Sequence, residues 1–253
     1  MNATEKFYFS HTCTIDYFLF AMWLSTKLSP QVLTILNQKQ SSEMILNSIN
    51  FIDKNDWNRA KTIWLFDVSL RNKDCFCESH ELKHSNTICT FGTEFVHIYS
   101  HISFLQAFFL SEKCNTCNID FSSKSTDPKS YLYLMKYKEK VVLNILEPSF
   151  CHLCLQELDK KCNFIESDPC WLICEIIGTL NLEYDDLPLK IQLNNRNYKL
   201  LCCTFNNNKN HFLGVFHFND SYYLVDDTNV KATRMIIEQI KHKIVTCFYY
   251  LEN

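Results

Sequence analysis

The chain has 253 residues, of which 47% are hydrophobic, so it can bury one large core or two smaller ones. Its net charge of −3 gives no general basic field that would attract nucleic acid. Because only three residues are glycine, a glycine-rich phosphate loop of the P-loop or Rossmann type is excluded.

Fourteen cysteines is a high count, which in a secreted protein of this size would suggest disulfides. Two CxxC pairs and the adjacent Cys202 and Cys203 look like metal ligands and reduced thiols. The apolar segment Ile15–Leu24 has the length of a signal-peptide core, but it contains Asp16 and no A-x-A-type cleavage site follows it. No run reaches the ~20 apolar residues of a membrane span. We expect a cytoplasmic or nuclear monomer with no membrane or nucleic-acid partner.

Helical periodicity dominates the first 110 residues. Apolar residues recur at helical spacing in stretches that begin at Cys13, Pro30 and Asn55, and again over residues 91–110. The polar segment 72–89 lies between the last two stretches and is predicted to be irregular.

Strand patterns dominate the second half. Residues 131–137 and 141–146 form a predicted hairpin, whereas CWLIC at 170–174 has a helix-like pattern. Further strands are predicted at 189–193, 198–205, 211–218, 221–227 and 245–252, with a possible helix over Thr233–His242. Helices followed by strands predict an α+β fold.

Two CxxC pairs, Cys114 with Cys117 and Cys151 with Cys154, enclose the predicted hairpin. Two such turns supply four thiolates for a tetrahedral structural zinc ion, which would fix a ribbon that has little core of its own. The alternative is four reduced cysteines in loops, or a redox pair. A second zinc could be held by an irregularly spaced set, namely Cys75, Cys77, His80, His84 and Cys89.

Three residues far apart in the sequence can form a nucleophilic centre. Cys13 opens the first helix, where the helix dipole favours a thiolate. His211 begins a strand, Asn219 and Asp220 make a tight turn, and the return strand ends at Asp226, so His211 and Asp226 should face each other. Nucleophile, base and orienting carboxylate then match a cysteine-protease triad. Without Cys13, a strand histidine near solvated carboxylates would be the simpler interpretation.

Several segments resemble the ubiquitin-specific proteases of the papain-like superfamily. TCTIDYFLFA at 12–21 is similar to their cysteine box, T-C-aromatic-L-N-S followed by an apolar helix. NHFLGVF at 210–216 with SYYLVDD at 221–227 resembles their histidine box, and VTCFYYLE at 245–252 resembles their final strand. The paired CxxC motifs resemble their zinc-bearing fingers. Asp16 matches the C-W-L-D box of the SUMO isopeptidase branch, where most members carry Asn.

The resemblance covers nearly the whole chain and implies a papain-like cysteine protease fold in a single catalytic domain, 1–253. It implies a helical thumb over 1–110, zinc-bearing fingers over 111–175 and a β-rich palm over 176–253. The implied activity is a thiol isopeptidase that removes ubiquitin or SUMO from lysine side chains. The implied catalytic residues are Cys13, His211 and Asp226.

Two positions depart from the family pattern. Tyr8 stands where the family often has an Asn that helps to hold the oxyanion, and Asn210 replaces the usual Gly. Oxyanion stabilisation would then fall to the backbone N–H of Cys13 and to Ser10, His11 or the neighbourhood of Asp227. Two alternatives stay open: an inactive binding module of the same fold, and a zinc-ribbon structural protein in which Cys13 is a core residue.

Overall fold

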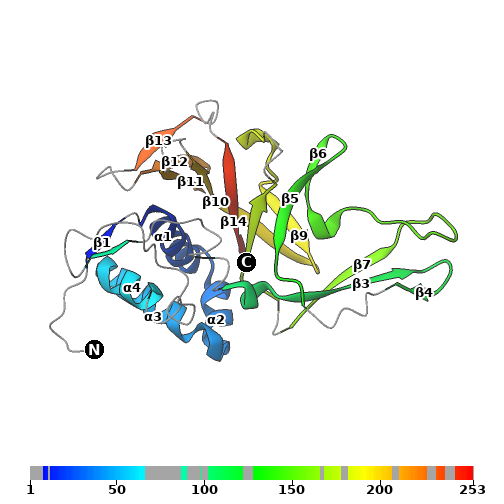
Figure 1. The fold of residues 1–253 in the computed structure, drawn as a ribbon, viewed down its shortest axis with the longest axis horizontal. Helices are drawn as coiled ribbons and strands as arrows, with labels where there is room; N and C mark the ends of the chain where they lie inside the picture. The colour runs from blue at the N-terminus through cyan, green and yellow to red at the C-terminus, as the bar shows by residue number, and fades with distance from the viewer. Residues whose placement is uncertain are drawn as a thin grey trace.

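The computed structural model describes residues 8–10, 12–65, 87–89, 98, 102–121, 128–165, 168–177, 182–206, 211–226, 232–236 and 243–252. Figure 1 shows the α-helices gathered at one side, a large sheet beside them and a small sheet that reaches the opposite end of the molecule. The chain therefore has an α+β architecture.

The described residues of the first part of the chain contain four α-helices: α1 (Cys13–Leu28), α2 (Pro30–Gln38), α3 (Glu43–Asp53) and α4 (Trp57–Ile63). The predicted helical stretch from Pro30 is thus two helices, separated by the 3₁₀ turn η1 (Gln40–Ser42). Within the described ranges there are also the 3₁₀ turns η5 (Ser103–Gln106), η6 (Asn144–Leu146) and η7 (Tyr184–Asp186).

The large sheet has nine strands in the described residues, in the order β13-β12-β11-β10-β14-β8-β5-β6, with β9 also paired to β10. Their bounds are β5 (Leu132–Tyr137), β6 (Lys140–Leu143), β8 (Trp171–Ile176), β9 (Lys190–Leu193), β10 (Arg196–Asn206), β11 (Phe212–Phe218), β12 (Ser221–Val225), β13 (Thr233–Met235) and β14 (Ile244–Leu251). All neighbours are antiparallel except β5 and β8. The strands predicted in the last seventy residues are confirmed.

Two smaller sheets complete the fold. A three-stranded sheet is formed by β3 (Phe108–Cys114), β4 (Ile119–Asp120) and β7 (Asp159–Phe164). The short strands β1 (Tyr8–Ser10) and β2 (Thr87–Cys89) pair in parallel.

Helix α1 is the centre of the main core. Ile15, Phe18 and Leu19 are buried, and the Phe18 ring meets Phe248 of β14 edge to face at 6.2 Å between centroids. A helix that is apolar on nearly all sides is buried on all sides. The sequence places α1 between the other helices and the sheet for this reason.

The predicted hairpin is confirmed as β5 and β6, but parts of four predicted elements differ from the structure. Phe108–Leu110, predicted as the end of a helix over 91–110, begins β3, and most of CWLIC lies in β8. Thr233–Met235 is β13 rather than the start of a helix, and Asn144–Leu146 is a 3₁₀ turn rather than a strand. Short apolar runs do not distinguish a strand from a helix by period, so pairing with neighbouring strands decides.

No helix among the described ranges is long and apolar enough to cross a lipid bilayer. The boundaries of thumb, fingers and palm at residues 110 and 175 stay predictions.

Candidate functional site

Cys13 is the first residue of α1 and is 7% exposed. Its place at the helix start follows from the sequence, because Thr12 provides the N-cap position and the apolar run begins directly after it. The positive end of the helix dipole favours an anionic sulfur at this position. Ser10, a predicted supporting residue, lies in the short strand β1, and His11 falls outside the described residues.

His211 and Asp226 are in direct contact. A two-residue turn at Asn219 and Asp220, both with positive φ (49° and 53°), joins β11 to β12 and sets their register. His211 just before β11 therefore meets Asp226 just after β12, and its Nε2 donates to Asp226 Oδ1 at 3.0 Å. The side chains are 23% and 20% exposed, so the predicted pairing is present and partly shielded from solvent. Asp227 lies outside the part of the chain that the structure describes.

Helix α1 is tied to the strand that follows His211. The Tyr17 hydroxyl, one turn after Cys13, donates a hydrogen bond of 2.8 Å to the backbone oxygen of Phe212. Gly214 allows this close approach, because a Cβ there would lie 3.0 Å from Cδ1 of Tyr17. These contacts link α1, one turn after Cys13, to the residue that directly follows His211.

The hydrogen bond to Asp226 distinguishes the two ring nitrogens of His211. With Nε2 bound to Asp226, the imidazole has Nδ1 as the nitrogen that can take a proton from a thiol. The same bond to Asp226 fixes the orientation of the ring.

An apolar pocket of about 260 Å³ lies beside the same helix. Asp16 and Tyr17 line it from α1, and Trp57, Phe216 and Tyr223 line it from α4, β11 and β12. Sequence patterns gave no sign of this pocket, because its walls come from four separate elements.

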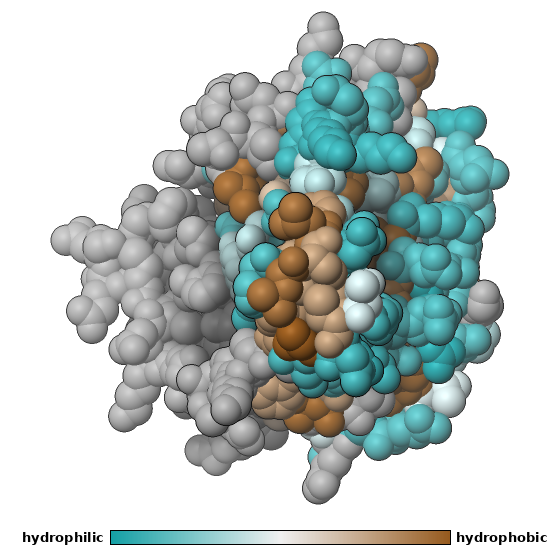
Figure 2. Space-filling model, turned by 90° about the vertical axis from the view of Figure 1, so that its right-hand side faces the viewer, coloured by the Kyte–Doolittle hydropathy of each residue, from teal (hydrophilic) through white to brown (hydrophobic). Residues whose placement is uncertain are grey.

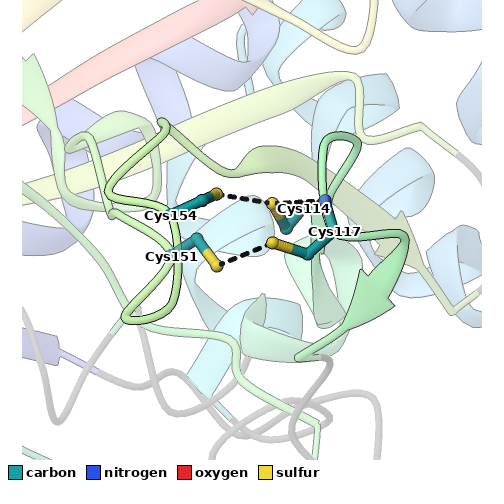
Figure 3. Close-up of side chains that lie close together, drawn as sticks. All are labelled: Cys114, Cys117, Cys151 and Cys154. Carbon is teal, nitrogen blue, oxygen red and sulfur yellow. Dashed lines mark hydrogen bonds between the residues drawn. The ribbon is translucent and has the colours of Figure 1, made fainter.

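The four cysteines predicted as zinc ligands form one cluster at the small sheet (Figure 3). Their sulfur atoms all lie within 4.8 Å of one another. The distances are 3.4 Å from Cys114 Sγ to Cys154 Sγ and 3.9 Å from Cys151 Sγ to Cys117 Sγ. Zn–S bonds of ≈ 2.3 Å in a tetrahedron place sulfurs about 3.8 Å apart. The cluster can therefore bind a structural zinc ion.

The thiols of this cluster cannot all ionise without a cation. Hydrogen bonding to Cys154, together with burial, raises the pKa of Cys117 to about 12. Burial also raises the pKa of Cys151, but backbone hydrogen bonds from Cys154 and Leu153 outweigh it and bring the pKa to about 7. The surroundings thus favour a thiolate at Cys151 and oppose one at Cys117. A bound cation is therefore needed to keep four thiolates together.

The cluster has only a small apolar core. Leu158 and Phe121 pack against the cysteines, apart from the main core. The edge of the Phe121 ring meets His152 with centroids 5.2 Å apart. Because so little apolar surface is buried, zinc would supply much of the stability of this end of the molecule.

Exposed apolar side chains surround the cluster. Figure 2 shows this end of the molecule facing the viewer. Hydrophobic residues gather near the middle of this face and are surrounded by hydrophilic ones. Phe150, Leu153 and Leu155 are 57%, 62% and 76% exposed. We call these three residues the fingertip patch. Exposed apolar groups of this kind mark interaction surfaces.

The remaining cysteines divide into two groups. Cys162, Cys170 and Cys174 are buried core thiols, and burial raises the pKa of each. The suggested second zinc set cannot be placed, because Cys75, Cys77, His80 and His84 lie outside the described residues and only the backbone of Cys89, in β2, is described.

No protein-family model matches the chain, and no curated protein matches it either. Among solved structures, it is similar to the SAGA Ubp8/Sgf11/Sus1/Sgf73 DUB module, with 13% identity and a TM-score of 0.45 over 98% of this chain and 68% of that chain. It is also similar to the MERS coronavirus papain-like protease (11%, TM-score 0.43, 96% and 63%). An essential yeast splicing factor matches equally well (10%, TM-score 0.43, 98% and 69%). Similarity this weak carries no argument about function.

Replacing Cys114→Ser should lower the bound zinc by one ion per chain, because three sulfurs no longer close the tetrahedral site. Metal content of the purified protein, measured by atomic emission, checks this. Cys162→Ser is the matched control, since Cys162 is also buried but lies outside the cluster. Equal zinc loss in both variants would contradict the assignment.

Replacing Tyr17→Phe should lower the free energy of unfolding by about 1 kcal/mol, because the Phe212 carbonyl loses its donor. Tyr198→Phe breaks a comparable bond to the oxygen of Pro169 at 2.9 Å and should have a similar effect in urea unfolding. Only Tyr17→Phe should also slow alkylation of Cys13. Equal Cys13 reactivity in the two variants would show that this bond does not position the thiol.

Proposed function

We propose that this protein is a cysteine isopeptidase that acts on ubiquitin or a ubiquitin-like modifier. The observation that carries the proposal is the His211–Asp226 hydrogen bond at the edge of β11, the strand to which Tyr17 binds the helix that begins with Cys13. Tyr17 lies one turn after Cys13, and Phe212 directly follows His211, so this contact supports the assignment of base and thiol to one site. Under this proposal the chain has a papain-like fold that consists of a thumb, zinc-bearing fingers and a palm.

The proposed reaction proceeds through an acyl-enzyme. Cys13 attacks the carbonyl carbon of the last glycine in the terminal Gly-Gly of the modifier, while His211 takes the thiol proton. His211 then gives this proton to the departing lysine amine, and Asp226 holds the charged ring. Water attacks the thioester, with His211 again as base, and releases the modifier and the free thiol.

The fingers have a binding role in this proposal. A glycine tail has few side chains to recognise, so most of the affinity must come from the folded body of the modifier. The fingertip patch offers apolar surface for that contact, and the zinc site would keep it rigid.

The modifier is ubiquitin or SUMO. Asp16, three residues after Cys13, favours SUMO by its resemblance to the C-W-L-D box.

A modifier-binding module without catalysis is the second candidate. It is favoured by Tyr8, which replaces the Asn that helps to hold the oxyanion in the family. In that case the same surfaces bind the modifier, but Cys13 forms no acyl intermediate.

Incubation with ubiquitin- and SUMO-propargylamide probes should give a covalent adduct at Cys13 with one of them, because the probe warhead lies where the reactive carbonyl binds. Intact-protein mass spectrometry checks the adduct. Cys13→Ala should abolish it and keep reversible modifier binding, whereas Cys202→Ser, which removes a buried core thiol, should still be labelled.

The other outcomes of this experiment are equally informative. Reversible binding of a modifier without any adduct contradicts the enzyme and supports the binding module. Neither adduct nor binding contradicts both and leaves a zinc-ribbon structural protein.

Replacing Leu153→Asp should weaken modifier binding by about tenfold or more, because a charge replaces an apolar contact group. Binding to the Cys13→Ala background, measured by calorimetry, checks this without turnover. Leu33→Asp is the control, since Leu33 is an exposed leucine (40%) on α2, away from the small sheet. Unchanged affinity for Leu153→Asp would rule out the fingertip patch as the contact surface.

A further inference from the structure

A shielded ion-pair network lies beside the first turn of α1. Lys61 Nζ of α4 forms an ion pair with Asp16 Oδ1 at 3.0 Å, without the geometry of a hydrogen bond. The same Nζ donates a hydrogen bond to Asp16 Oδ2 at 3.2 Å. It also donates to the Thr12 hydroxyl at 3.3 Å, and that hydroxyl donates to Asp16 Oδ2 at 2.5 Å. The Lys61 and Asp16 side chains are only 15% and 18% exposed. Solvent therefore screens this pair less than an ordinary surface pair.

The network changes the charge around the thiol. Asp16 follows Cys13 by three residues, so both project from the same face of α1. A carboxylate at that distance opposes ionisation of the sulfur. The Lys61 ammonium offsets this effect, because it binds the carboxylate directly.

The network also changes the helix cap. Thr12 occupies the N-cap position but makes no side-chain hydrogen bond to the first turn. Its hydroxyl donates to Asp16 instead. The Thr12 side chain therefore does not cover the first backbone N–H groups of α1, which are the donors that a developing oxyanion requires.

We propose that Lys61 and Asp16 are positioning residues for Cys13: together they balance the charge around the sulfur and hold the Thr12 hydroxyl away from the helix start. The catalytic use of this device rests on the proposed isopeptidase function. The effect of Lys61 and Asp16 on the ionisation of Cys13 does not rest on that function and can be measured separately.

Other charged groups lie on elements next to the start of α1. On α4 itself, Asp56 at the N-cap and Arg59 carry opposite charges. His211 before β11 and Asp226 after β12 bind each other. Asp226 and a protonated His211 form a neutral pair, as Lys61 and Asp16 do. Removing Lys61 alone therefore leaves one uncompensated carboxylate near the thiol.

The test is the pH dependence of Cys13 alkylation by iodoacetamide, quantified by mass spectrometry on the peptide that contains Cys13. Lys61→Met should move the midpoint upward by about one pH unit and slow the reaction several-fold at neutral pH. Adding Asp16→Asn to that variant should restore the midpoint, because the uncompensated charge is gone. Lys61→Arg should keep it.

Lys27→Met is the matched control. Lys27 pairs with Asp53 at 2.7 Å near the other end of the same helix, so its removal should leave the midpoint unchanged. If Lys61→Met does not fold, Asp16→Asn alone carries the test with the opposite sign, since the uncompensated ammonium should lower the midpoint. An unshifted midpoint in either folded variant, or a double variant without rescue, overturns the proposal.

Failure of this proposal and failure of the proposed function give different results. A shifted midpoint with no probe adduct at Cys13 contradicts the isopeptidase and keeps the positioning role. An adduct in the unchanged chain with no shift in Lys61→Met keeps the isopeptidase and removes the positioning role.

Discussion

The candidate site depends on the close packing of α1 against β11. Tyr17 reaches the backbone of Phe212, and Gly214 leaves room for the Tyr17 ring. Because the contact is made by a buried hydroxyl and a missing Cβ, neither partner can shift without losing a hydrogen bond or creating a clash. The residue that opens the helix and the residue that precedes the strand are thereby held in a fixed relation, although nearly the whole chain separates them.

Much of the site could be predicted because its signals are local. A two-residue turn at Asn219 and Asp220 fixes which residues of β11 and β12 face each other, so the contact of His211 with Asp226 follows from the turn. Each CxxC pair is likewise a local knuckle. That the two knuckles meet follows from ligand chemistry, since a structural zinc ion requires four donors.

The parts that the sequence did not reveal are decided by packing between distant segments. The apolar period of residues 170–174 fits a helix or a buried strand, and the pairing of β8 with β14 and β5 decides for the strand. Lys61 has no motif around it and looks like one more solvated lysine of a short helix. Only the packing of α4 beside α1 shows that its ammonium lies against Asp16. The apolar pocket is hidden for the same reason.

The distance between the two sites bears on what can bind. The small sheet extends to one end of the molecule, whereas α1, β11 and β12 lie toward the opposite side (Figure 1). A short peptide at Cys13 does not reach the fingertip patch, but a folded domain with an extended tail can touch both. If the thiol and the metal-held surface serve one ligand, that ligand must therefore have the shape of a small protein with a flexible end, and the two halves of the site would then divide recognition from chemistry.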